Sequence, residues 1–188
     1  MKEIITIKSH KGVDFWRDYQ FGDEQIDKYF LKFLDQNCKH FELKNDEETQ
    51  FGKHCDVLCI NKKGKKKLLE IKNTSYYNTH IFAETVSCPR DGTLGWMHTC
   101  EADYLLYGMP TQDRYSDDIY VYIIDFPRFK QWFWEMGNHK HCVERSTKKK
   151  NASICKMVSC RSLVLHEIAK VCRLSPYGTY EILDDGVV

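Results

Sequence analysis

Two short apolar runs of the chain are joined by a lysine-rich stretch. The first segment is "CDVLCI" (55–60), the second is "KKLLEIK" (66–72), and "NKKGKK" (61–66) joins them with Gly64 at its centre. A short apolar run that a turn bounds is typical of a buried β-strand, and a short polar loop that contains glycine is typical of a hairpin. The pattern therefore predicts two antiparallel strands whose apolar residues enter the protein core.

Longer patterns predict a helix before this hairpin and further elements after it. From Asp23 to Gln36 the apolar residues recur with helical spacing, and Asp23 is a candidate cap. Downstream, the pattern predicts strands at "THIFAETVS" (79–87) and "DIYVYIIDF" (118–126), a helix at "RFKQWFWEM" (128–136), a polar loop over 137–152, and either a strand or a helix at "SLVLHEIAKVC" (162–172).

This order of elements favours an α/β domain built around a central mixed β-sheet that helices flank. A chain of 188 residues fits one domain. We therefore expect residues 1–188 to form a single domain, with a core over about 20–135 and with a basic loop and a C-terminal extension over 137–188.

The charge and the cysteines narrow the class of protein. The net charge is +1, so any contact with nucleic acid has to come from local basic patches. The nine cysteines lack regular spacing, which argues against a secreted disulfide scaffold, and "HKHC" (139–142) is too isolated for a structural zinc site. The sequence shows neither the apolar run of a signal peptide nor a window with the length of a membrane helix. We expect a cytoplasmic protein with no membrane partner.

Three ionisable residues interrupt the apolar hairpin. Glu70 and Lys72 point to the same face of their strand because side chains alternate, and Asp56 falls near Glu70 when the strands pair across the Gly64 turn. Two carboxylates at short range raise each other's pKa unless a cation compensates. Such oxygen ligands suit Mg²⁺, and the backbone carbonyl of Ile71 faces the same region. The alternative is a surface hairpin with a cross-strand ion pair, against which the apolar context "LLEIK" argues.

The order of an acidic helix, an aspartate and a Glu-x-Lys motif on a hairpin resembles the PD-(D/E)XK nuclease superfamily, which has the restriction-endonuclease-like fold. Asp56 matches its first strand aspartate, Glu70 its second acid and Lys72 its lysine, while Cys55 replaces the usual proline. The stretch after the lysine is similar to small phage-type and resolvase-like members. The positions that match there are Glu84, Gly95, Trp96, Ala102, Asp103 and Tyr104, and the resemblance covers roughly residues 20–125.

The resemblance implies a restriction-endonuclease-like core and Mg²⁺-dependent hydrolysis of phosphodiester bonds, with Mn²⁺ able to substitute. Asp56, Glu70 and the Ile71 carbonyl would bind the metal, and Lys72 would position the attacking water. DNA of unspecified strandedness is the expected substrate, and endonuclease is favoured over exonuclease. Many relatives pair to cut both strands, so a homodimer is a further expectation. The alternative is a catalytically inactive nucleic-acid-binding or protein-interaction domain on the same fold, against which the intact motif argues.

Family members also place an acid on the first helix, facing the metal site, and three residues compete for this role. At about 100° per residue in an α-helix, Asp27 lies among the apolar positions Phe30 and Leu34, Glu24 lies at their edge, and Asp23 occupies the cap. An acid set into a core face costs desolvation unless it is paired or binds a metal. The helical phase therefore selects Asp27 as a further catalytic and metal-binding residue, with Glu24 next. A hydrogen bond at the rim of the core is the structural alternative for Asp27.

Several other residues have both a functional and a structural interpretation. The lysines of the turn are either phosphate contacts or a solvated charge run; they are Lys62, Lys63, Lys65, Lys66 and Lys67. Glu84 is either a supporting site residue or a surface acid. Packing or structural hydrogen bonding is favoured over catalysis or base stacking for His80, His98, Trp96, Trp132, Phe133 and Trp134.

Overall fold

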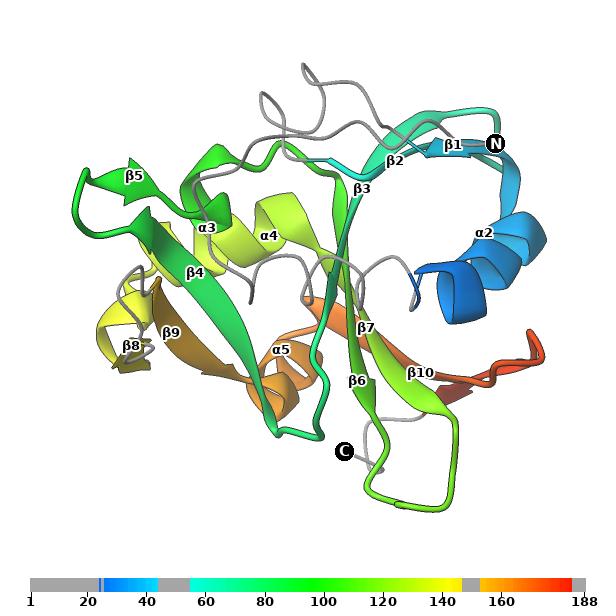
Figure 1. The fold of residues 1–188 in the computed structure, drawn as a ribbon. Helices are drawn as coiled ribbons and strands as arrows, with labels where there is room; N and C mark the ends of the chain where they lie inside the picture. Colours follow the sequence, from blue (N-terminus) through cyan, green and yellow to red (C-terminus); the bar gives the residue numbers. More distant parts are fainter. Residues whose placement is uncertain (1–23, 25, 44–54, 147–152, 184–188) are drawn as a thin grey trace.

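The computed structural model describes residues 24, 26–43, 55–146 and 153–183, which form an α/β fold with two β-sheets (Figure 1). The larger, mixed sheet has the strand order β1-β2-β3-β6-β7-β10-β11, and we call it the main sheet. The four-stranded small sheet has the order β5-β4-β9-β8. The predicted α/β class and its central mixed sheet are confirmed, whereas the pattern did not predict a second sheet.

The strands of the main sheet lie side by side in the order in which they occur in the sequence. Its members are β1 (Cys38–Leu43), β2 (Val57–Asn61), β3 (Lys66–Asn73), β6 (Tyr104–Pro110), β7 (Ile119–Asp125), β10 (Ala169–Leu174) and β11 (Tyr180–Leu183). Within the described residues, β3 and β6 are parallel and the other neighbouring strands are antiparallel. The small sheet contains β4 (His80–Cys88), β5 (Thr93–Leu94), β8 (Val143–Ser146) and β9 (Ile154–Ser159).

The helical segments are short and several of them depart from α-helical geometry. The α-helices are α2 (Leu31–Asn37), α3 (Trp96–Thr99), α4 (Phe126–Lys130) and α5 (Cys160–Leu165). The segments η1 (Ile26–Phe30) and η3 (Gln131–Glu135) are π-helical, and η4 (Asn138–Lys140) is a 3₁₀ turn. The predicted helix over 23–36 is therefore η1 followed by α2, and the predicted helix over 128–136 is α4 followed by η3. None of the helices in the described part of the chain has the length and apolar character that crossing a bilayer requires.

The remaining sequence predictions have mixed outcomes. The hairpin and the strands over 79–87 and 118–126 are confirmed as β2, β3, β4 and β7. The predicted loop over 137–152 is wrong in part, because η4 and β8 lie within it and residues 147–152 are outside the described residues. Both interpretations of 162–172 hold, since α5 ends at Leu165 and β10 begins at Ala169. The strands β1, β5, β6, β8, β9 and β11 were not predicted.

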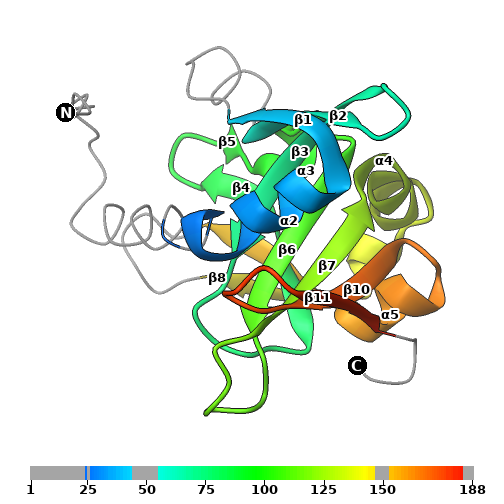
Figure 2. The same ribbon diagram turned by 90° about the vertical axis from the view of Figure 1, so that its right-hand side faces the viewer.

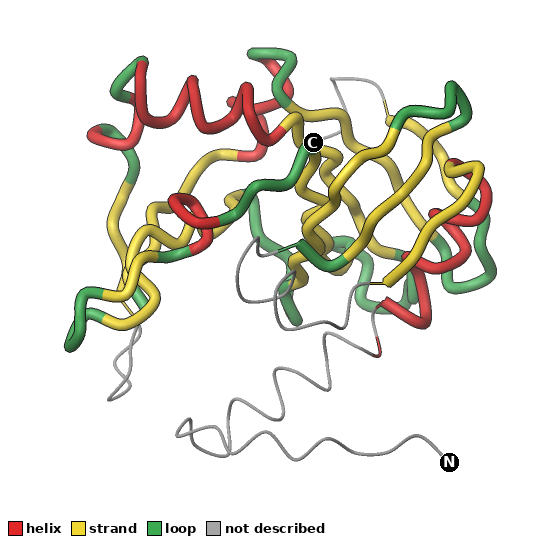
Figure 3. The backbone as a smooth tube through the Cα atoms, turned by 90° about the horizontal axis from the view of Figure 1, so that it is seen from above, coloured by secondary structure: helices red, strands yellow, loops and turns green. Residues whose placement is uncertain are grey.

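Apolar side chains pack on both faces of the main sheet. On one face, η1 and α2 contribute Phe30, Phe33 and Leu34, which pack with Leu69 and Ile71 of β3; we call this the helix-side core. On the other face lies the inter-sheet core, built from β6 and β7, from the inner side of β4 and β9, and from α3, α4 and α5. Figure 2 shows α2 in front of the main sheet, and Figure 3 separates the strands of the two sheets seen from above.

The beginning and the end of the described chain are joined by hydrogen bonds. The Lys32 ammonium donates to the carbonyl of Pro176 at 2.8 Å, and the Gln36 amide donates to the carbonyl of Gly178 at 2.8 Å. Both acceptors lie in the turn between β10 and β11. The hairpin of β10 and β11 therefore holds α2 against the main sheet.

Gly95 connects the small sheet to α3 at a point of close approach, which generates a stability prediction. A Cβ at this position would overlap the backbone carbonyl of Glu84 on β4. We expect Gly95→Ala to lower the free energy of unfolding by at least about 3 kcal/mol, because backbone cannot move aside as a flexible side chain can. Urea denaturation followed by circular dichroism measures the change.

Gly92 supplies the matched control for this substitution. It has a φ of 73° and open space around its Cα, so Gly92→Ala should cost only about 1 kcal/mol of backbone strain. Equal losses for the two variants would contradict the close packing of α3 against β4.

Candidate active site

The turn between β2 and β3 is fixed by hydrogen bonds within the turn itself. The Asn61 side-chain oxygen accepts from the backbone N–H groups of Lys63 and Lys65, each at 3.0 Å. The Gly64 N–H donates to the Asn61 carbonyl at 2.8 Å, and Gly64 has a φ of 78°, a conformation that suits glycine. The turn predicted around Gly64 is thus confirmed, and it sets the register of the hairpin.

This register brings Asp56 opposite Glu70, as the sequence predicts. Val57 pairs with Leu69, and the Asp56 N–H donates to the Leu69 carbonyl at 2.9 Å. The Asp56 carboxylate then accepts from the Ile71 N–H at 2.7 Å. The backbone of β3 therefore holds the Asp56 side chain in place, one residue along from Glu70.

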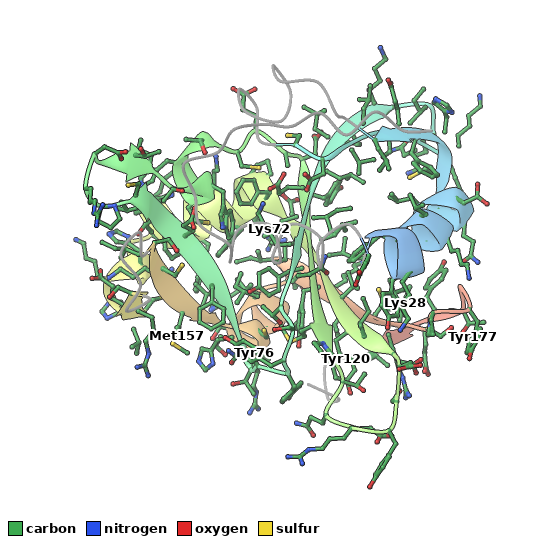
Figure 4. All side chains as sticks on the ribbon, in the orientation of Figure 1. Lys28, Lys72, Tyr76, Tyr120, Met157 and Tyr177 are labelled. Carbon is green, nitrogen blue, oxygen red and sulfur yellow. The ribbon has the colours of Figure 1, made fainter. Side chains whose placement is uncertain are left out.

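Glu70 and Lys72 form an ion pair on the face of β3 that is turned away from α2. The Glu70 side chain is only 3% exposed, whereas the Lys72 side chain is 36% exposed and opens the site to solvent. The Lys72 ammonium contacts Oε1 of Glu70, and the other oxygen, Oε2, is buried with no hydrogen-bond partner in the described structure. Figure 4 shows Lys72 on the side of β3 toward the small sheet. One carboxylate oxygen of Glu70 is thus left unsatisfied.

Burial and neighbouring charges shift the pKa values of this pair. Burial raises the pKa of Glu70 well above its ordinary value; Lys72 opposes this effect and Asp56 adds to it. Burial lowers the pKa of Lys72, but the attraction of Glu70 and Asp56 outweighs it, so the pKa of Lys72 lies above its ordinary value. Lys72 is therefore a cation at neutral pH, whereas the Glu70 carboxylate needs a further positive charge to be stable there.

Two cysteines border the site, and the sequence pattern predicted a role in it for neither of them. Cys55 and Cys100 are both 1% exposed. The charge of Glu70 raises the pKa of Cys55, and Cys100 raises the pKa of Glu70. The hydrogen bond from Cys100 lowers the pKa of Cys55 against the effect of burial, and the same hydrogen bond, together with burial, raises the pKa of Cys100. Cys55 precedes Asp56, but Cys100 reaches the site through the crossover from β3 to β6, for which the local sequence holds no signal.

The carboxylates meet the needs of Mg²⁺ in part. Mg²⁺ keeps several waters and accepts one or two carboxylates. Asp56 and Glu70 supply two, and the unpartnered Oε2 of Glu70 is the kind of buried oxygen that a cation would satisfy. The described residues contain no group of three or more His, Cys, Asp or Glu side chains that could hold a metal ion. The predicted Ile71 ligand contributes its N–H to Asp56, and a metal-binding role for its carbonyl stays a prediction.

The helix acids are only partly within the described structure. Asp23 and the side chain of Asp27 lie outside the described residues, and Glu24 is exposed. The segment that holds Asp27 is π-helical, so the angle of about 100° per residue that selected it does not apply there. The described residues that follow it, Tyr29 and Phe30, pack in the helix-side core, on the opposite face of β3 from Glu70. The roles of Asp27 and Glu24 stay predictions.

Glu84, His80 and His98, the remaining candidates from the sequence, are not part of the ion pair of Glu70 with Lys72. Glu84 is half-buried on β4, in alternation with the buried Ala83, so it points away from the inter-sheet core. The Nδ1 atom of His80 is 2.9 Å from the Thr79 hydroxyl, with which it forms a hydrogen bond. The exposed His98 lies over Trp134, with ring centroids 4.5 Å apart.

The aromatic residues after β7 are packing residues, as favoured from the sequence. Phe133 is fully buried, and Trp132 and Trp134 pack against the inter-sheet core. Trp96 lies against Phe126 at a centroid distance of 5.8 Å. In "HKHC", the Cys142 thiol donates to the carbonyl of Asn138. The Nδ1 atom of His139 lies 3.0 Å from the carbonyl oxygen of Phe133. These contacts join α3 to α4 and η3 to η4.

The turn lysines divide into two kinds. Lys67 is half-buried, and its ammonium lies 2.6 Å from the Asp103 carboxylate at the start of β6. The Leu68 N–H donates to the same carboxylate at 2.8 Å. The other four are exposed and are Lys62, Lys63, Lys65 and Lys66. Lys67 therefore joins β3 to β6, and the remaining lysines face solvent.

Comparison of the chain with protein-family models, with curated proteins and with solved structures finds no match. A function therefore follows only from the chemistry of the residues themselves. Asp56, Glu70 and Lys72 combine two carboxylates with one cation at a partly open position. Such a set is able to bind a divalent cation and to stabilise an anionic group beside it.

Glu70 generates a prediction that does not depend on enzymatic activity. In metal-free buffer at pH 8, Glu70→Gln should raise the free energy of unfolding by about 1–3 kcal/mol, because it removes a buried charge with an unpartnered oxygen. The pKa of Glu70 is raised on folding, so the wild type loses stability as pH rises through that pKa. The gain should therefore vanish as pH falls to the ordinary value of 4.5. Denaturant titrations across this pH range measure it.

Magnesium chloride extends the same measurement. It should raise the melting temperature of the wild type and leave that of Glu70→Gln unchanged, since bound ligand stabilises the folded state. The exposed Glu181 on β11 is the control, and Glu181→Gln should stay within about 0.5 kcal/mol of the wild type. Destabilisation by Glu70→Gln at every pH would mean that the ion pair with Lys72 outweighs the cost of burial.

Proposed function

We propose that the chain is a Mg²⁺-dependent nuclease of the PD-(D/E)XK type with a restriction-endonuclease-like core, and that it hydrolyses phosphodiester bonds in DNA. The observation that carries the proposal is the nearly buried Glu70 carboxylate, which has one oxygen on Lys72 and the other without a partner, opposite the anchored Asp56. The connectivity supports it too, because a helical segment precedes an antiparallel hairpin whose second strand has a parallel neighbour.

Each residue has a distinct role in this proposal. Asp56 and Glu70 would hold Mg²⁺, which supplies Lewis-acid stabilisation of the phosphoryl group when it is bound. The Ile71 N–H keeps Asp56 in place through its hydrogen bond at 2.7 Å. Lys72 would position the attacking water and neutralise the anionic phosphate; in the metal-free site the attraction of Glu70 and Asp56 raises its pKa and keeps it a cation.

The alternative is a catalytically inactive nucleic-acid-binding or protein-interaction domain on the same fold. One observation favours it: no group of three or more potential metal ligands occurs among the described residues. Incubation of plasmid and single-stranded DNA with Mg²⁺, and in parallel with EDTA, separates the two. Degradation that EDTA stops supports the nuclease, and salt-sensitive binding without degradation supports the binding domain.

The three residues of the motif should be individually essential for cleavage. We expect Asp56→Asn, Glu70→Gln and Lys72→Ala each to reduce the rate by at least about 100-fold, because each removes a metal ligand or a charge that stabilises the transition state. Gel assays of plasmid and end-labelled DNA measure the rate, and circular dichroism checks the fold. Near-wild-type turnover in any variant would show that its residue has a different role.

The exposed lysines of the turn should contribute to DNA binding without sequence preference. Replacing Lys62, Lys63, Lys65 and Lys66 with serine should weaken binding and reduce the slope of log K against log salt by up to about 4, because each phosphate contact contributes about 0.9. Fluorescence anisotropy at several salt concentrations gives this slope. The exposed Lys170 lies on β10, which is not a neighbour of β2 or β3 in the main sheet, and its replacement serves as the control. An unchanged slope would place the turn away from DNA.

A further inference from the structure

The outward face of the small sheet carries a row of apolar side chains. Phe82 on β4 is opposite Met157 on β9, which is opposite Val143 on β8. The neighbouring Ile81 and Val158 point the other way and are fully buried in the inter-sheet core. Phe82 and Met157 are half-buried, and Val143 is 59% exposed. The sheet thus buries one face and leaves an apolar row on the other.

Tyr76 extends this row from the loop that follows β3. Its ring is 55% exposed and meets Phe82 edge-on, with centroids 6.4 Å apart and the ring planes at 66°. The Thr74 hydroxyl donates to the Tyr76 carbonyl at 2.9 Å, and the Thr74 N–H donates to the Gly108 carbonyl at 3.0 Å. Figure 4 shows Tyr76 below Lys72. The exposed row is therefore Tyr76, Phe82, Met157 and Val143.

A cation lies beside one end of the exposed row. The Nε atom of Arg145 donates to the Met157 sulfur at 3.4 Å, and Arg145 has no acidic partner among the described residues. Glu84 is on the same face, opposite Cys155, which separates it from Arg145. Phosphate is therefore favoured at the Arg145 side of this face and disfavoured at the Glu84 side.

The exposed row is close to the candidate active site along the chain. Tyr76 is four residues after Lys72. Four residues span at most roughly 14 Å. A nucleic-acid strand with a phosphate at Lys72 is thus within a few nucleotides of the Tyr76 ring.

We infer that the exposed row binds the unpaired bases of single-stranded DNA that extends from the phosphate at Lys72. Aromatic rings that stack on bases, beside a cation, are how proteins bind single strands, and bases stacked within a duplex cannot use them. The inference deepens the proposed nuclease and rests on it for the choice of ligand, and it assigns a substrate with a single-stranded segment.

Binding without cleavage tests the inference. The probe is a fluorescein-labelled oligodeoxythymidine of about 12 nucleotides, in the range of known single-strand site sizes. It is titrated by fluorescence anisotropy with full-length Glu70→Gln, and gels confirm that it stays intact. Adding Tyr76→Ala should weaken binding roughly tenfold, whereas Tyr76→Phe should retain it, because stacking needs the ring and not the hydroxyl. Binding of a duplex of the same length should not change.

Two further variants complete the test. Arg145→Gln should reduce the salt slope by about 1. Tyr177, which is 85% exposed and lies next to α2, is the matched control, and Tyr177→Ala should bind like the parent. Equal binding by Tyr76→Ala and the parent, or equal losses in the two tyrosine variants, would overturn the inference.

Two more outcomes separate this inference from its rivals. If sedimentation velocity shows that Tyr76→Ala abolishes self-association while oligonucleotide binding is unchanged, the row is a contact between copies and the inference fails. Cleavage by the wild type without any effect of Tyr76 would remove this inference and leave the nuclease proposal standing. Oligonucleotide binding that depends on Tyr76 in a chain that never cleaves would do the reverse.

Discussion

Asn61 and Gly64 hold the turn between β2 and β3, and the candidate site depends on the register that this turn sets. Side chains alternate along a strand, so a slip of one residue would exchange the two faces of β3. Glu70 and Lys72 would then point toward α2, and Ile71 would leave the helix-side core. The hydrogen bonds within the turn and the apolar packing on β3 favour the same register, and their agreement places the charged residues on one face.

Burial of the charged Glu70 side chain on β3 costs folding free energy, and the neighbouring residues offset only part of that cost. Glu70 lies almost out of contact with solvent, and Lys72 satisfies one of its oxygens. Asp56 adds a second carboxylate, which the N–H of Ile71 restrains. A purely structural ion pair has no need of an oxygen without a partner, whereas a site that receives a cation does. The cost of burying charge in this site thus falls mainly on the Glu70 carboxylate.

Local pattern predicted the parts of the fold that a few adjacent residues determine. The apolar runs around Gly64 and in β7 are sufficient to identify strands, and the alternating directions of side chains along a strand place Glu70 and Lys72 on one face. The strands β1 and β11 were not predicted, because they lie at the edges of the main sheet, are largely exposed and contain no apolar run that marks a buried strand. Cys100 reaches the site only through the parallel pairing of β3 with β6, a contact between distant segments that periodicity does not encode.

The hydrogen bonds of α2 with the turn after β10 have a consequence for the order in which the protein acquires its structure. Lys32 and Pro176 are separated by 144 positions, and Cys172 and Leu174 complete the helix-side core. Contacts between such distant positions form late, because the intervening chain must first be closed into a loop. On the ribosome, the surface on which α2 docks is therefore completed only when nearly the whole of the described chain has emerged. Until then, the hydrogen bonds that hold α2 over the face of β3 opposite the candidate site cannot form.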